Sequence, residues 1–102
     1  MPWLLGLQQE SAKHQLRLGS HAEELDRIDT AILCAVKAGS KPPSNSKIFG
    51  ALGDASIECA EVLDEYTDRP IPAHVHNGLS RLLCAVTDLE ASLKLYGVLS
   101  IP

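Results

Sequence analysis

The chain has 102 residues, of which 45% are hydrophobic and 22% are charged, and its formal net charge at pH 7 is −4. A chain of this length buries about 65% of the surface that it exposes when unfolded, which predicts a single domain over residues 1–102 and excludes disorder along the whole chain. No apolar run approaches the roughly 18–20 residues of a membrane span. The negative charge argues against general binding to nucleic acid or to anionic membranes.

Residues 1–19 begin with an apolar stretch and become amphipathic. The stretch is too short for a signal peptide and no basic residue precedes it. Gly19 is expected to end the segment, because glycine is a poor helix former. We therefore expect an N-terminal arm or short helix, whose apolar residues pack on the body of the protein or on a partner. The candidate contact residues are Trp3, Leu4 and Leu7.

The first main helix is predicted over residues 21–38. Ser20 and Glu23 have the spacing of a capping box, in which each side chain bonds a free amide at the start of the helix. Apolar residues then recur every three or four positions as far as Ala35, which gives the helix one buried face. Gly39 stands where a left-handed residue commonly ends a helix.

The second helix is predicted over residues 46–66, after a loop that contains Pro42 and Pro43. Gly53 interrupts the helical pattern at a cost of about 1 kcal/mol. Either one helix bends at this residue, or two shorter helices meet there in a turn. The apolar seam has alternating spacings of four and three residues and consists of Ile48, Leu52, Ala55, Cys59, Val62 and Tyr66.

The third helix is predicted over residues 72–96, with Pro72 in the first helical position and Gly97 as its stop. Its apolar seam repeats the same spacings. Three helices joined by short polar connectors predict an all-α fold, a small bundle of antiparallel neighbours. Seven residues form the third seam, namely Val75, Leu79, Leu82, Val86, Leu89, Leu93 and Tyr96.

Carboxylates are concentrated in residues 54–68, which contain no basic residue before Asp68. One interpretation is a solvated helix face that keeps the protein soluble. The other is a docking surface for a basic patch on a partner, which charge complementarity would steer and orient. The candidate docking residues are Glu58, Glu61, Asp64 and Glu65.

The second helix also resembles a helix-turn-helix motif in its apolar anchors and turn glycine, at Ile48, Leu52, Gly53, Cys59 and Leu63. The resemblance implies two short helices across a turn, the second of which would enter the major groove. The sequence departs from the motif at Phe49, where a small residue is usual. The would-be recognition helix also carries carboxylates, which repel phosphates.

The start of the third helix resembles two kinds of phosphorelay sequence. His76-Asn77-Gly78-Leu79, with Leu82-Leu83 and Leu89-Glu90, resembles the histidine box of some sensor-kinase dimerisation helices. His74-x-x-Asn77-Gly78 is similar to the histidine phosphotransfer motif, although lysine usually stands in place of Asn77. Both resemblances imply a helical bundle with an exposed phosphorylated histidine. Pro70 and Pro72 leave only about one helical turn before His76, whereas those families place the histidine well inside a helix.

Three cysteines lie 25 residues apart, at Cys34, Cys59 and Cys84. This spacing fits no compact zinc motif, and the odd number predicts reduced thiols buried in the core of a cytoplasmic protein. His74 and His76 point in different directions on a helix and cannot share one ion. The chain has no nucleophile elbow, phosphate loop or HExxH motif, so we expect no catalytic, cofactor or metal site.

The sequence therefore favours a non-enzymatic protein–protein interaction module in the cytoplasm that serves as an adaptor, inhibitor or regulator. Its partner is another protein or a second copy of the chain, and no membrane contact is expected. Two alternatives remain open at this stage. They are a helix-turn-helix regulator that binds nucleic acid and a protein similar to the histidine phosphotransfer domains.

Overall fold

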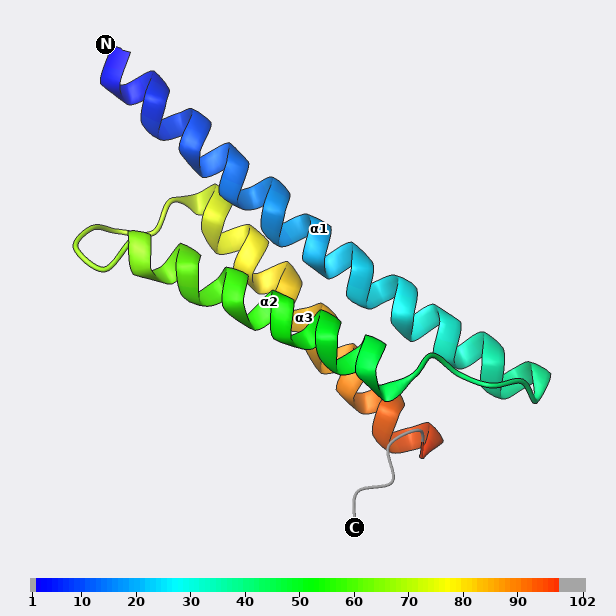
Figure 1. The fold of residues 1–102 in the computed structure, drawn as a ribbon. Coiled ribbons are helices and arrows are strands. Elements are labelled where there is room, and N and C mark those ends of the chain that lie inside the picture. Colours follow the sequence, from blue (N-terminus) through cyan, green and yellow to red (C-terminus); the bar gives the residue numbers. More distant parts are fainter. Residues whose placement is uncertain (1, 98–102) are drawn as a thin grey trace.

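The structure, a computed structural model, describes the backbone of residues 2–97 and the side chains of residues 12–95. It contains three helices, α1 (Pro2–Ala38), α2 (Asn45–Glu65) and α3 (Ala73–Tyr96), and the described residues form no strand (Figure 1). α1 and α3 run in the same direction and α2 runs in the opposite one. The all-α fold class and the three main helices are confirmed.

The predicted boundary at Gly19 is wrong, because α1 continues through it without interruption. Ser20 is an exposed residue in the middle of this helix and caps nothing, so residues 2–19 are not a separate short helix. Leu18 and Leu25, on either side of the expected boundary, are fully buried. An Arg81 guanidinium nitrogen also donates a 3.3 Å hydrogen bond to the Gly19 carbonyl oxygen. Burial of the flanking residues outweighs a glycine cost of about 1 kcal/mol.

The other local signals near the end of α1 behave as expected. Gly39 has a φ of 68°, and the Ser40 amide donates a 2.9 Å hydrogen bond to the Ala35 carbonyl oxygen, which completes a Schellman motif. Ser44 then caps α2, because its hydroxyl oxygen accepts a hydrogen bond from the Lys47 amide. α2 passes through Gly53 as one helix, and this settles the alternative left open above.

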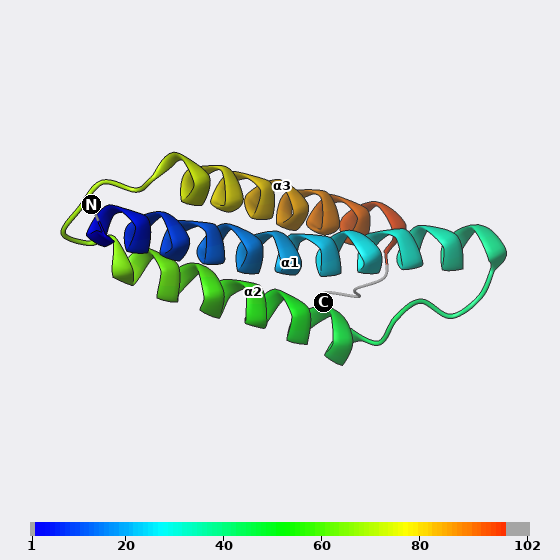
Figure 2. The same ribbon diagram turned by 90° about the horizontal axis from the view of Figure 1, so that it is seen from above.

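α1 is the central element, and both other helices pack mainly on it (Figure 2). α3 has the more extensive contact with α1, α2 has less, and α2 and α3 touch each other only at few points. The expectation that successive helices pack against each other is therefore confirmed for α1 and α2. α2 and α3 have little contact with each other. All three helices contribute buried side chains to the described core. Its fully buried large side chains are Leu18, Leu25, Ile32, Ile48, Val62, Val75, Leu82 and Leu89.

α1 and α3 approach each other closely at Gly78. This residue is buried, and a Cβ atom there would lie 3.1 Å from Leu18 Cδ1 and 3.5 Å from Gln15 Cα. The first turns of α3 thus lie opposite residues 15–18 of α1. Of the Asn77-Gly78 pair that suggested a phosphorelay motif, Gly78 is a buried helix-packing contact and Asn77 is exposed.

α1 is longer than the bundle that it organises. Its 37 residues span about 55 Å at 1.5 Å per residue, and the long dimension of the whole molecule is 57 Å. α2 and α3 have 21 and 24 residues and are correspondingly shorter. The first turns of α1 therefore continue past the end of α2 and the start of α3 (Figure 1). We call residues 2–10, which precede the first described contact of α1 with the rest of the bundle, at His14, the overhang.

Candidate functional site

The four carboxylates predicted to form a docking face do not share one environment. Glu61 and Asp64 are exposed on α2, as expected for a docking face. Glu65 is half-exposed and lies near the imidazole of His14. Glu58, in contrast, is buried, and only 8% of its side-chain surface is accessible. The prediction that Glu58 belongs to an exposed acidic face is wrong.

Glu58 is buried because it belongs to the seam that α2 turns toward α1. It lies three residues after Ala55 and four before Val62, both of which are buried. Two α1 side chains meet its carboxylate, since Glu58 Oε1 lies 3.2 Å from Arg17 Nε and 3.4 Å from His21 Nε2. Such a pair links helices specifically but contributes little net stability, because burying the charges is costly. Glu58 is therefore a structural residue and offers nothing to a partner.

A second polar contact lies further along the same interface, at the end of α2. His14 is buried, and its Nδ1 atom lies 2.9 Å from the hydroxyl oxygen of Tyr66, at hydrogen-bonding distance. His14 Nε2 lies 3.6 Å from Glu65 Oε2. The Arg69 guanidinium stacks over the Tyr66 ring at 4.7 Å from its centroid. Glu65 is thus partly engaged by the bundle, which leaves Glu61 and Asp64 as the freer carboxylates of the predicted set.

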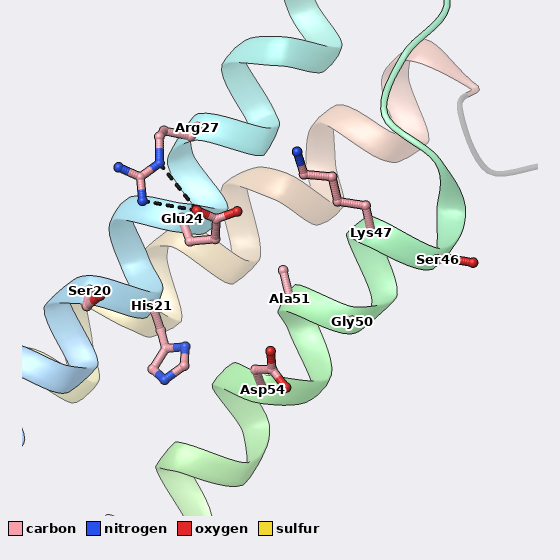
Figure 3. A pocket seen from close by; sticks show the side chains of 9 residues that line it. All are labelled: Ser20, His21, Glu24, Arg27, Ser46, Lys47, Gly50, Ala51 and Asp54. Atoms are coloured by element: carbon pink, nitrogen blue, oxygen red, sulfur yellow. Dashed lines mark hydrogen bonds and ion pairs between the residues drawn. The ribbon is translucent and has the colours of Figure 1, made fainter.

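A polar cleft of about 470 Å³ opens between the first half of α2 and the middle of α1 (Figure 3). Both signs of charge line it, with His21, Glu24 and Arg27 on α1 and Lys47 and Asp54 on α2. Arg27 is already tied to Glu24, with its Nη2 atom 3.0 Å from Glu24 Oε2. A balanced and open cleft of this kind selects no particular ligand charge.

A second hollow, of about 520 Å³, lies between α2 and α3 and is lined by residues of these two helices only. We call it the α2–α3 groove. The groove exists because α2 and α3 both pack on α1 and have little contact with each other. Leu63 and Leu83 form its rim and are 47% and 67% exposed. The groove has a single charged residue among its lining, which comprises Leu52, Ala55, Ser56, Cys59, Ala60, Leu63, Leu79, Leu82, Leu83, Val86 and Glu90.

Sequence reasoning placed Leu52, Cys59, Leu79, Leu82 and Val86 in the helix seams but did not find the groove. The sequence feature that could have indicated the groove is the width of the apolar stripes on α2 and α3. Ala60 and Leu63 on α2 and Leu83 on α3 extend each stripe beyond what one neighbouring helix can cover. A stripe that is wider than its intramolecular partner leaves apolar surface for another contact.

The three cysteines are free, but only one has the expected setting. Cys34 and Cys84 are exposed, which contradicts their predicted burial. Cys59 is partly buried in the wall of the groove. Burial raises the pKa of the Cys59 thiol, and the neighbouring Glu58 carboxylate raises it further. Cys59 is therefore a weakly reactive thiol, unlike a catalytic or redox-active one.

The structure also describes the residues that suggested the phosphorelay and helix-turn-helix alternatives. His74 and His76 are exposed in the first turn of α3, directly after Pro72. The helix-turn-helix geometry is absent from residues 45–65, because no turn occurs at Gly53.

Among the residues whose side chains are described, no group of three or more His, Cys, Asp or Glu side chains is arranged to hold a metal ion. Within the same part of the chain, no helix has the length and apolar character needed to cross a membrane.

The predicted contact residues Trp3, Leu4 and Leu7 lie on the described backbone of α1, in the overhang, but their side chains are outside the described set. No protein-family model, curated protein or solved structure matches the chain. The candidate site therefore rests on geometry alone. Its strongest element is the α2–α3 groove.

Proposed function

We propose that this protein is a non-enzymatic interaction module, an adaptor, inhibitor or regulator that binds another polypeptide in the α2–α3 groove. The observation that carries the proposal is the open apolar groove, with Leu63 and Leu83 exposed at its rim. An exposed leucine in isolation is ordinary, but two that face one apolar hollow mark a surface suited to a helix. A helix laid between α2 and α3 would complete a four-helix arrangement and remove these side chains from water.

The acidic residues Glu61 and Asp64 support the same function in a secondary role. Both are exposed on α2. Charges at the edge of an interface steer the approach of a partner and change its salt dependence more than its final affinity. We therefore propose that these two residues steer basic surfaces of a partner that lie outside the helix docked in the groove.

The three free cysteines support a reducing compartment, and we propose a cytoplasmic location on that basis. Counting free thiols by mass spectrometry after rapid alkylation of intact cells tests this. Three alkylated cysteines are expected. A disulfide-linked form as the main species would contradict the location.

Affinity capture from lysate, with three baits and with nuclease-treated and untreated halves, tests the function. The baits are the wild type, Leu83→Glu in the groove, and Leu95→Glu, a control on the same helix whose side chain is 77% exposed and lines no part of the groove. A protein retained by the wild type and the control, but lost from Leu83→Glu, is expected, because a buried glutamate would be desolvated without a partner. Equal capture by all three baits would reject the groove as the binding site, and material lost on nuclease treatment would favour the nucleic-acid alternative.

A further inference from the structure

We propose that the occupant of the α2–α3 groove is the overhang of a second copy of this chain, exchanged reciprocally in a homodimer. This inference rests on the proposed function, because it needs the groove to be a binding site. It goes further in naming the polypeptide that binds there. Three properties of the chain point to this occupant.

The first property is a heptad pattern in α1 that extends beyond the part of this helix on which α2 and α3 pack. Positions seven residues apart in the sequence form one series at Leu4, Ser11, Leu18, Leu25 and Ile32 and a second at Leu7, His14, His21, Ile28 and Ala35. From His14 onward these positions contact α2 or α3, and most are buried. A pattern of this kind specifies contact with a neighbouring helix. It continues to Leu4 and Leu7 in the overhang.

The second property is the agreement in length between the overhang and the groove. Nine residues of helix, 2–10, span about 14 Å. The groove is lined along α2 from Leu52 to Leu63 and along α3 from Leu79 to Glu90, a length of about 16 Å on each wall. The overhang is therefore short enough to lie along the groove without extending into the connectors.

The third property is the low charge of both surfaces. The overhang has one charged residue, Glu10, at its inner end, and the groove lining has one, Glu90. A strongly basic partner helix would find a single carboxylate inside the groove, whereas the sequence Trp3-Leu4-Leu5-Gly6-Leu7 offers an uncharged apolar segment. Removing both apolar surfaces from water is favourable, and no charge has to be desolvated at the centre of the contact.

Reciprocal exchange follows from the direction of the helices. The overhang projects beyond the end of the bundle at which α2 ends and α3 begins, and Leu63 and Leu79 are the groove-lining residues of each helix nearest to that end. A two-fold axis perpendicular to the long axis of the bundle directs each overhang back along the other copy. Both contacts then form at once, and the interface closes at two copies rather than growing into a chain.

The experiment measures the mass of the full-length protein in solution by light scattering and by sedimentation equilibrium. The variants are the double substitution Leu4→Glu with Leu7→Glu in the overhang, Leu83→Glu in the groove, and Leu95→Glu as a control. The wild type and the control are expected to be dimers. Each of the other two is expected to raise the dissociation constant of the dimer by about tenfold or more, because it places a charge in an apolar contact. All substituted positions lie in the overhang or are exposed, so circular dichroism is expected to show an unchanged helix content.

Mixing the two defective variants provides a sharper test. The overhang variant has an intact groove and the groove variant has an intact overhang, so one of the two contacts can form between them. A mixed dimer is expected where neither variant forms one alone. Alkylation of Cys59 gives an independent readout, since a seated overhang covers the groove wall. Cys59 is expected to be protected in the wild type and exposed in both defective variants, with Cys84 as the exposed reference.

A wild type that stays monomeric at the highest soluble concentration would overturn the inference, and so would a dimer that tolerates both the overhang and the groove substitutions. These outcomes are separate from a failure of the proposed function. If the wild type is monomeric but another protein is still lost from Leu83→Glu in the affinity capture, the groove binds a different polypeptide. If neither self-association nor capture depends on Leu83, the proposed function itself is wrong.

Discussion

Gly78 of α3 and Leu18 of α1 approach so closely that a Cβ atom on the glycine would lie 3.1 Å from the leucine Cδ1 and 3.3 Å from its Cβ. Leu18 is completely buried and cannot rotate away without leaving the core. This contact sets the spacing of the most extensively packed pair of helices. It makes glycine at position 78 a requirement of packing rather than of backbone conformation, because α3 is regular there.

The first prediction compares two glycines in helix interiors. Gly78→Ala is expected to lower the free energy of unfolding by about 1–3 kcal/mol, because the methyl group overpacks the α1–α3 contact. Gly53→Ala is expected to raise it by about 0.5–1 kcal/mol, since nothing lies within 4 Å of the added Cβ and alanine favours a helix. Urea denaturation of the two variants gives the comparison, and two changes of the same sign would contradict it.

The second prediction concerns the buried Glu58 and its two partners. Replacing Arg17 by methionine and His21 by leucine leaves a buried carboxylate without a cation, and the double variant is expected to lose about 2 kcal/mol or more of stability. Glu58→Met is expected to lose less, because Arg17 is 62% exposed and water can take over its charge. Thermal or urea unfolding tests the order of the two effects.

Glu61→Gln is the matched control for this pair, because it removes an exposed carboxylate from the same helix. Its effect is expected to stay within about 0.5 kcal/mol of the wild type. A Glu58→Met variant less stable than the double variant would show that the carboxylate stabilises the interface in its own right.

The third prediction concerns thiol reactivity and its pH dependence. Cys34 and Cys84 are exposed and are expected to react first with a small alkylating reagent, whereas Cys59 reacts more slowly and needs a higher pH. The raised pKa of Cys59 means that less thiolate, the reactive form, is present at a given pH. Rates at each cysteine, followed by peptide mass spectrometry across a pH series, test this. Equal rates at all three cysteines would contradict it.

The sign of the linked stability change follows from the same shift. A pKa that is higher in the folded protein than in the unfolded chain stabilises the fold while the thiol stays protonated. This contribution is complete below the ordinary thiol pKa and is lost as the pH rises through the pKa of the folded state. Stability is therefore expected to fall on the alkaline side, and Cys59→Ala is expected to remove that part of the dependence.

The fourth prediction separates the overhang from the rest of α1. Deletion of residues 2–10 is expected to leave cooperative unfolding in place, because His14 and Leu18, the first buried residues described in α1, are kept. Deletion of residues 2–18 removes both and is expected to abolish the folded bundle. Circular dichroism melts at low protein concentration make the comparison, and similar melting of the two truncated proteins would contradict the boundary.

Most of the architecture could be predicted from sequence, because the α2 and α3 seams repeat with helical spacing and because Ser44 and Gly39 act through their own neighbouring residues. The failure at Gly19 and Ser20 has the opposite cause. A capping box is a local signal, and here burial of Leu18 and Leu25 against distant segments outweighs it. Local signals are decisive only where tertiary contacts do not oppose them.

The site was harder to predict because charge was taken to indicate exposure. Glu58 has the spacing of a seam residue, and Arg17 and His21 lie four residues apart and so share one face of α1. That pairing was the available signal for its burial. Cys34 shows the reverse error, since it stands in an apolar run yet lies on the exposed side of α1. The groove itself depends on how α2 and α3 are splayed, which no spacing within one helix encodes.

The uneven packing of the three helices has a consequence for hydrogen exchange. α3 is held to α1 over most of its length, while α2 has less contact with α1 and little with α3. Segments with fewer tertiary contacts open at lower free-energy cost. Amide protons of α2 are therefore expected to exchange by detachment of that helix, while the α1–α3 pair stays closed until global unfolding. An intermediate with α2 released would expose the apolar stripe of α2 and the part of the α1–α3 pair that α2 covers. The same weak attachment that leaves the groove open therefore sets the main route by which this fold can aggregate.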